Sequence, residues 1–175
     1  MRPGAGDRQR DLVRHRRPVQ HAAAAAFTEP TELAERIARS RSLHAAVGRA
    51  VAGRFAAAGL DVRPPQAAFY LYPSFGAWRG PLAAYHGVTT GQALARHLLD
   101  RYGMGVLPAG AFGEDSRALR MRVATGLLYG DTDAQRELAL AAPGSLTLPW
   151  IAAALDRIED ILAGLAPRHR AARPA

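Results

Sequence analysis

Apolar residues recur at every third or fourth position over two long segments of this chain, which is the pattern of an amphipathic helix. The first segment, residues 30–59, has apolar positions at Leu33, Ile37, Leu43, Val47, Val51 and Phe55. Thr28 is the predicted N-cap of this helix, Pro30 belongs to its first turn, and Gly59 is the predicted stop. The second segment, 149–165, has an apolar stripe of Ile151, Leu155, Ile158, Leu162 and Leu165.

Three shorter segments have the composition or the alternation of β-strands. Residues 68–72 form an aromatic run, residues 106–107 form a short apolar run that ends at Pro108, and residues 119–124 alternate apolar with polar side chains. We therefore expect a small, mostly antiparallel sheet of about three strands. With helices packed on one of its faces, the predicted fold class is α+β.

The aromatic run has two interpretations. Phe69, Tyr70 and Tyr72 could form a platform on which nucleic acid bases stack. Aromatic residues that alternate along a strand more often pack in a core. Core packing is therefore the prediction for these three side chains.

Shorter helices are predicted around these strands. Residues 19–27 are helix-like in composition, and 73–88 is a predicted loop because it is rich in glycine and proline. Thr89 with Gln92 and Thr132 with Gln135 have the spacing of capping boxes, which predicts a helix after each threonine. The first of these two helices should end near Gly103, and the second should end at Pro143-Gly144.

The net charge of +8 is concentrated at the two ends of the chain. Residues 1–17 carry six arginines against two aspartates, and residues 167–175 carry three arginines without an acidic residue. The segment between them, 18–166, has a net charge of only +1. A body so close to neutral does not predict a basic groove, so we do not expect specific binding to nucleic acid.

Several classes of site are excluded by composition. The chain has no cysteine, which excludes disulfides, thiolate metal sites and thiol nucleophiles, and its six histidines show no metal-ligand spacing. No apolar run reaches the roughly 20 residues that span a bilayer, and no secretory signal is recognisable. We therefore expect a cytoplasmic protein without a membrane partner. All 23 basic residues are arginine, so no lysine is available for Schiff-base chemistry.

Five segments resemble, in the same order, the pyridoxal-phosphate-dependent class I/II aminotransferases of fold type I. Residues 18–24 look like the helix that closes the large domain of that family, and 30–59 resembles the helix that connects its large and small domains. Residues 69–73 are similar to the first strand of the small domain. Residues 105–113 resemble a segment that reads roughly Gly-Val-x-Val-x-Pro-Gly-x-x-Phe-Gly, and 119–125 resembles the strand whose arginine binds the substrate.

The resemblance implies that this chain is the C-terminal part of such an enzyme. It divides the sequence into a basic mobile arm (1–17), the end of the large domain with the interdomain helix (18–60), the small domain (61–166) and a basic tail (167–175). The fold that it implies is the family's small domain, a mostly antiparallel sheet covered by helices and preceded by a long interdomain helix.

The resemblance also implies site residues. Arg120 corresponds to the arginine that binds the α-carboxylate of the amino-acid substrate through two parallel hydrogen bonds. Arg122 has the same side-chain parity on the strand, so the residue pattern by itself does not separate the two. Gly110 and Phe112 would line the substrate entrance, although an ordinary turn is an equally good interpretation of that loop.

Two positions depart from the family pattern. Ala67 stands where the family usually has glycine before the aromatic strand, and Ala109 stands where it usually has glycine after the proline. A Cβ disfavours positive φ, so we expect an altered or less stable backbone near the substrate entrance.

In the intact family the cofactor is pyridoxal phosphate, and its lysine, aspartate and phosphate cradle belong to the large domain. Because this chain has no lysine, we expect no catalytic residue and no covalently bound cofactor in it. The first hypothesis is a partial aminotransferase that is inactive alone. The alternatives are a non-enzymatic interaction module with basic tails, and a chain that complements a separate large-domain polypeptide. The expected partners are such a chain or a second copy in a homodimer.

Overall fold

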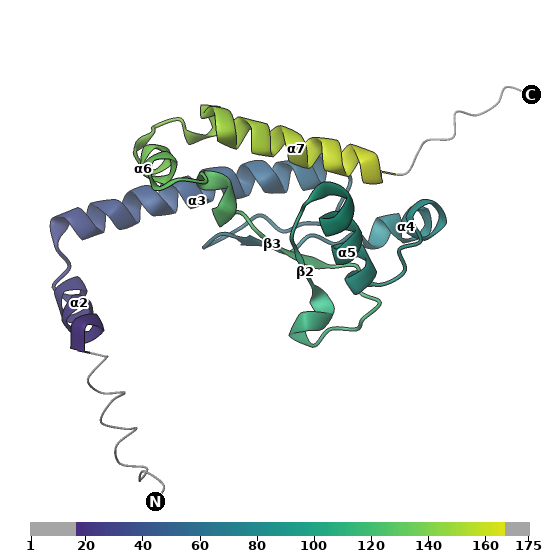
Figure 1. The fold of residues 1–175 in the computed structure, drawn as a ribbon, viewed down its shortest axis with the longest axis horizontal. Helices are drawn as coiled ribbons and strands as arrows, with labels where there is room; N and C mark the ends of the chain where they lie inside the picture. The colour runs from purple at the N-terminus through teal and green to yellow at the C-terminus, as the bar shows by residue number, and fades with distance from the viewer. Residues whose placement is uncertain (1–16, 167–175) are drawn as a thin grey trace, which may run out of the picture. The chain divides into compact units, whose positions relative to one another are not determined.

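The computed structural model describes residues 17–166 (Figure 1). The chain divides into two compact units, 1–39 and 40–175. The predicted tail 167–175 and nearly all of the predicted arm 1–17 lie outside the described residues. The division of the sequence into four parts stays a prediction. No helix in the described part of the chain is long and apolar enough to cross a membrane.

The first unit contains α2 (Arg17–Phe27) and the beginning of α3 (Thr31–Ala57). The predicted role of Thr28 is wrong, because its hydroxyl donates to the carbonyl oxygen of Ala25 at 2.7 Å and so closes α2. The carbonyl of Pro30 accepts the first hydrogen bonds of α3, from the amides of Leu33 and Ala34. Two helices thus meet within three residues, and both the amide and the hydroxyl of the threonine donate to a carbonyl in the last turn of the first one.

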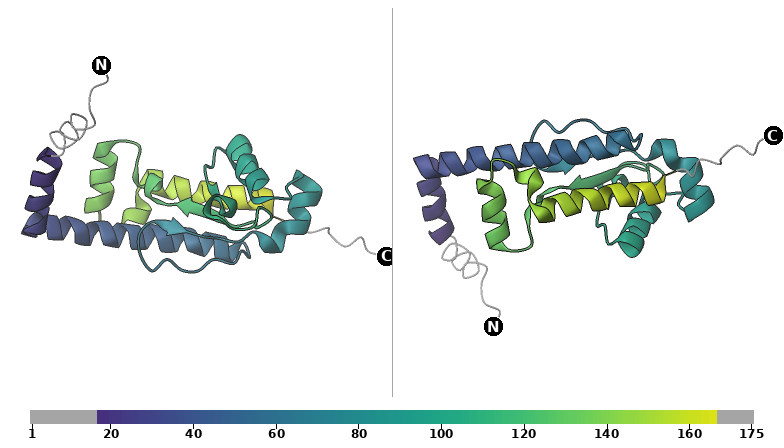
Figure 2. Two further views of the ribbon diagram at one scale, coloured as in Figure 1. Left: turned by 90° about the horizontal axis from the view of Figure 1, so that it is seen from below. Right: turned by 90° about the horizontal axis from the view of Figure 1, so that it is seen from above.

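The core of the second unit lies between α3, α7 (Pro149–Leu165) and the sheet. From Ser40 onward α3 runs beside α7 (Figures 1 and 2), and the Arg54 guanidinium donates to the carbonyl of Leu155 at 3.1 Å and pairs with Glu159 at 3.0 Å. The apolar stripes predicted for both helices are buried from this point, at Leu43, Val47, Val51, Phe55, Ile151, Leu155, Ile158, Leu162 and Leu165. Ile37, earlier in the predicted stripe of α3, is exposed.

The sheet has three strands in the order β1 (Tyr70–Leu71), β3 (Met121–Ala124) and β2 (Leu107–Pro108), and both pairs are antiparallel. Leu71 pairs with Val123, and Pro108 pairs with Met121. All four of these side chains are buried and belong to one face of the sheet. Helices cover this face, so the predicted α+β class is confirmed, although the strands are shorter than the sequence pattern suggested.

Helices α4 to α6 complete the second unit. The predicted loop 73–88 instead contains the 3₁₀ turn η1 (Gly76–Trp78) and α4 (Arg79–His86), which ends at Gly87 in the left-handed region. Helix α5 (Gly91–Tyr102) is capped by Thr90 and not by Thr89, because the Thr90 hydroxyl accepts from the amide of Ala93. The capping box predicted at Thr132 is confirmed at the start of α6 (Asp133–Ala141).

The opposite face of the sheet is largely exposed. Tyr70 and Tyr72 are 44% and 37% accessible, whereas Leu71 between them is 3% accessible. Core packing was therefore the wrong prediction for the two tyrosines. The run alternates as a strand must, but its aliphatic residue faces the core and its phenol rings face solvent.

Candidate functional site

Arg120 lies just before β3, where three segments of backbone meet. Its carbonyl accepts from the amide of Ala109 at 2.9 Å, and its backbone forms a bridge with Ser74. Next to it the carbonyl of Leu119 accepts from the amide of Phe75 at 2.7 Å. These contacts hold the Cα of Arg120 between the chain that follows β1 and the 3₁₀ turn η2 (Ala109–Phe112).

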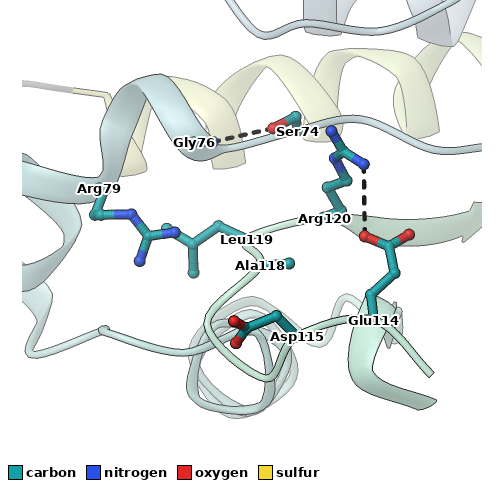
Figure 3. A pocket seen from close by; sticks show the side chains of 8 residues that line it. All are labelled: Ser74, Gly76, Arg79, Glu114, Asp115, Ala118, Leu119 and Arg120. Atoms are coloured by element: carbon teal, nitrogen blue, oxygen red, sulfur yellow. Dashed lines mark hydrogen bonds and ion pairs between the residues drawn. The ribbon is translucent and has the colours of Figure 1, made fainter. Parts of the chain in front are cut away.

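An open cleft of about 430 Å³ surrounds the Arg120 side chain. Figure 3 shows Ser74 and Gly76 on one side of it, Glu114 and Asp115 on the other, and Arg79 at its far end. The cleft is thus lined by two arginines and two carboxylates. It is open to solvent, and its four charged side chains favour a small charged ligand over a large apolar one.

The guanidinium of Arg120 is only weakly engaged within this cleft. One of its nitrogens lies 3.5 Å from Oε2 of Glu114, at the limit of a hydrogen bond, and the Arg120 side chain is 52% accessible. Oε1 of Glu114 accepts a 2.7 Å hydrogen bond from the Tyr72 hydroxyl. Burial raises the pKa of Tyr72, and this carboxylate raises it further. Because an arginine has five N–H donors, a planar fork remains available at Arg120 for a carboxylate.

Arg122 belongs to β3 and has a different environment from Arg120, which lies just before that strand. Its guanidinium carbon lies 4.7 Å from the ring centre of Tyr70 and 4.4 Å from that of Phe112. Tyr70 comes from β1 and Phe112 from η2, so the two rings approach β3 from its two sides. The alternation of side chains along a strand gives Arg120 and Arg122 the same orientation, so the sequence did not distinguish them. The contact with the two rings does distinguish them.

The two residues predicted to line the substrate entrance, Gly110 and Phe112, are not among those that line this cleft. Gly110 and Phe112 are both exposed on η2, and Phe112 contacts the guanidinium of Arg122. Of the two departures from the family pattern, neither Ala67 nor Ala109 has a positive φ. The left-handed residue is Ala68, at φ 57°, so the unfavourable backbone lies immediately before the aromatic run.

Arg79 is a cleft residue that the sequence pattern did not suggest. Its guanidinium donates to the carbonyl of Arg117 at 2.7 Å and to that of Thr89 at 3.4 Å. The bond to Arg117 ties the first residue of α4 to the loop that carries Glu114 and Asp115, and the bond to Thr89 ties it to the segment between α4 and α5. Gly87 was the sequence signal that could have indicated α4, because a glycine often ends a helix, and α4 would have placed Arg79 at its start.

Two histidine clusters lie outside this cleft. The imidazole of His44 joins Ser40 (3.1 Å from Nε2) to the Tyr129 hydroxyl (2.6 Å from Nδ1). The rings of His86 and His97 are 5.0 Å apart, and Nε2 of His97 is buried without a hydrogen-bond partner among the described residues. Burial lowers the pKa of both His44 and His97. Within residues 17–166 no cluster of three or more metal-ligating side chains is present.

The residues of this chain do not fit pyridoxal phosphate as a covalently held group. That attachment needs a lysine amine, and the 175 residues contain none. The guanidinium groups of the cleft cannot replace it, because arginine stays protonated at any usable pH. The chemistry that the Arg120 guanidinium offers in this cleft is the binding of an anion.

Comparisons with known proteins support the family that the sequence resembles. The sequence model for aminotransferase class I and II matches residues 7–128. The fold is similar to that of an aromatic aminotransferase from Pyrococcus horikoshii OT3, with a TM-score of 0.56 and 20% sequence identity. That similarity covers 83% of this chain but 31% of the archaeal protein, so the chain spans about a third of its length. The family match extends over more than half of the residues, and the chain belongs to the class I and II aminotransferase family.

Proposed function

We propose that this chain is the small-domain part of an amino-acid aminotransferase, in which Arg120 holds the α-carboxylate of the substrate. The observation that carries the proposal is the state of the Arg120 guanidinium. The guanidinium is half exposed in an open cleft, the backbone of Arg120 is held by hydrogen bonds, and the ion pair with Glu114 is 3.5 Å long. A substrate carboxylate that binds the planar fork with two short hydrogen bonds would form a stronger contact than this one.

The role of the chain in the reaction is to bind and orient the substrate. Arg120 fixes one end of the amino acid, and the exposed loop with Gly110 and Phe112 borders the same face of the sheet. In the intact family pyridoxal phosphate withdraws electrons from the substrate's α-carbon, and that chemistry needs a lysine that this chain does not contain. We propose that the chain alone is inactive.

The missing chemistry would come from a second polypeptide, either a separate large-domain chain or another copy that completes a homodimer. Exposed apolar side chains on the first unit support such a partner. Val19, Phe27 and Ile37 are 70%, 87% and 51% accessible, so this unit presents apolar side chains that a partner would cover. We place this assembly in the cytoplasm.

A second candidate function is a non-enzymatic interaction module. It is favoured by the exposed face of the sheet, where Tyr70, Tyr72, Leu107 and Phe112 are all at least 37% accessible. Tyrosine, phenylalanine and arginine together are typical of binding surfaces. This candidate predicts a stable monomer that binds a partner without any dependence on amino acids.

Reconstitution tests the proposed role of Arg120. The chain would be mixed with, or fused to, a family large domain that carries the lysine, and transamination of alanine would be measured. We expect Arg120→Lys and Arg120→Ala each to lower kcat/KM about tenfold or more, because lysine keeps the charge but loses the planar fork. Arg122→Ala is the matched control and should have a much smaller effect on this monocarboxylic substrate. Loss of activity at Arg122 with tolerance at Arg120 would shift the site assignment by two residues.

A spectroscopic experiment tests the inactivity of the chain alone. Pyridoxal phosphate would be added to the purified protein, followed by dialysis and an absorbance spectrum. We expect no imine band to survive, because the only amine left is the α-amino terminus. A stable band that maps to an internal residue would contradict the proposal.

A further inference from the structure

Two histidines of neighbouring helices meet outside the Arg120 cleft. His86 is the last residue of α4, and His97 lies in the middle of α5, eleven positions later in the chain. Gly87, in the left-handed region, ends α4 before the chain turns into α5. The centres of the two imidazole rings lie 5.0 Å apart, and the ring planes are inclined at 61°. The pair is thus a product of the tertiary structure and has no local sequence motif.

One nitrogen of this pair lacks a partner. Nε2 of His97 is buried, and no hydrogen bond reaches it from any described residue. A buried polar atom without a partner is unfavourable, and in folded proteins such atoms generally meet a bound water or an ion. The rings beside His97 are those of His86 and Tyr102, at 5.0 Å and 6.0 Å between centres. An imidazole nitrogen with a free lone pair next to a second imidazole is the donor set of a metal ion.

The distance between the rings agrees with two imidazoles that share one metal ion. Tetrahedral Zn²⁺ binds histidine nitrogens at about 2.0–2.1 Å, which places the centres of two such rings roughly 5 Å apart. Edge-to-face packing of two rings falls in the same range of distances. Packing alone leaves Nε2 of His97 without a partner, however, whereas a shared ion supplies one.

The charges around the pair are compatible with a cation. A metal ion binds the neutral imidazole, and burial keeps His97 neutral at pH 7 because it lowers the pKa, as do the positive charges of His86 and Arg101. Arg101 opposes a bound cation and Asp100 favours it, so these two neighbours offset each other. His86 stands in the last turn of α4, where the helix dipole presents its negative end.

We infer that His86 and His97 form a binding site for one divalent transition metal ion of the zinc type. Nε2 of His97 is one ligand, a ring nitrogen of His86 is the second, and water occupies the remaining positions. The ion joins the end of α4 to the middle of α5 and so stabilises the packing of these two helices. This site is independent of the proposed role of Arg120.

A zinc titration of the full-length chain tests the site. The protein would first be dialysed against a chelator, and binding would be followed by calorimetry and by long-range ¹H–¹⁵N NMR spectra of the histidine rings. We expect one saturable site at which the ring nitrogen signals of His86 and His97 shift together. Cu²⁺ should bind more tightly than Zn²⁺, and Mg²⁺ should not bind, because the ligands are imidazoles.

Histidine variants locate the bound ion. His86→Gln and His97→Gln should each weaken zinc binding about tenfold or more, because each removes one of the two protein ligands. His21→Gln, at an exposed histidine of α2, is the matched control and should leave the affinity unchanged. Circular dichroism checks that the variants fold, and His86→Gln, at the end of a helix, tests the site even where His97→Gln does not fold.

A second measurement separates metal binding from simple packing of the two rings. Zinc should move the urea midpoint of the wild-type chain to a higher concentration, because the ion binds the folded state in preference to the unfolded one. The same zinc concentration should leave the midpoint of His86→Gln nearly unchanged. A histidine pair that served only as packing would show no such dependence on zinc.

The absence of saturable zinc binding would overturn the inference. Zinc binding that ignores His86→Gln would also overturn it, since the ion would then be an adventitious one on other histidines. Neither result would bear on the proposed function, because no amino acid or carboxylate enters these measurements.

Discussion

The two faces of the small sheet are built from the same strands and differ in almost every physical property. On one face Leu71, Met121 and Val123 are 3%, 0% and 6% accessible and contact the helices. On the other face Tyr70 and Tyr72 are at least 37% accessible, and two arginines lie beside them. Alternation along a strand is the cause, since neighbouring residues point to opposite sides.

Because the two faces differ in this way, residues that stabilise the fold and residues available to bind a ligand alternate along the same strands. Side chains of the buried face contribute through the apolar area that they remove from water. Among the described residues, those of the exposed face form the ring contacts of Arg122, the weak ion pair of Arg120 and the hydrogen bond from Tyr72 to Glu114. Substitutions on one face should therefore act on folding, and substitutions on the other should act on ligands.

The largest expected effect tests this separation directly. Met121→Ala removes a fully buried side chain, and such changes cost about 2–5 kcal/mol because a cavity remains. Arg122→Ala, one residue further along the strand, should cost less than about 1 kcal/mol. Urea denaturation monitored by circular dichroism measures both. A loss from Arg122→Ala as large as that from Met121→Ala would show that the exposed face is structural.

A smaller effect is expected from pH, and it originates in the helices and not in the exposed face of the sheet. Burial lowers the pKa values of His44 and His97, and for His97 the positive charges of His86 and Arg101 lower it further, against an opposing effect of Asp100. As pH falls below about 6.5 the unfolded chain binds protons before the folded one does, so the free energy of unfolding decreases.

Urea denaturation at pH 7.5 and at pH 5.5 measures this loss. His97→Gln should make the stability less dependent on pH over this interval, because one of the two shifted groups is gone. The matched control is His21→Gln, an exposed histidine of α2. A protein that is as stable at pH 5.5 as at pH 7.5 would contradict the expectation.

The smallest effect concerns the backbone before β1. Ala68 has a φ of 57°, where an L-residue is strained and glycine is not. Ala68→Gly should therefore raise the free energy of unfolding by about 0.5 kcal/mol, after the greater entropy of glycine in the unfolded chain is subtracted. Ala67→Gly is the control, because Ala67 has no positive φ and should gain nothing. The two melting curves distinguish these outcomes.

Local sequence patterns were sufficient to predict much of the fold, because helices and their caps depend on contacts between residues that are close in the sequence. The apolar stripe of α7 and the capping box of Thr132 were predictable, since both depend on contacts within one or two helical turns. Helix α4 was missed because its segment reads as a loop, and its first residue, Arg79, is held by carbonyls of Thr89 and Arg117. Such long-range hydrogen bonds have no local signature.

The sequence by itself determined the family resemblance, the single-sided α+β architecture, and the lack of any lysine. These follow from residue identity and spacing alone. The tertiary structure alone decided the different environments of Arg120 and Arg122, because the two arginines have the same parity and the same charge. The distinction depends on the Phe112 ring, which η2 brings to Arg122 from ten residues away, and on Glu114, which leaves the fork of Arg120 mostly unused. Only packing across strands creates that difference.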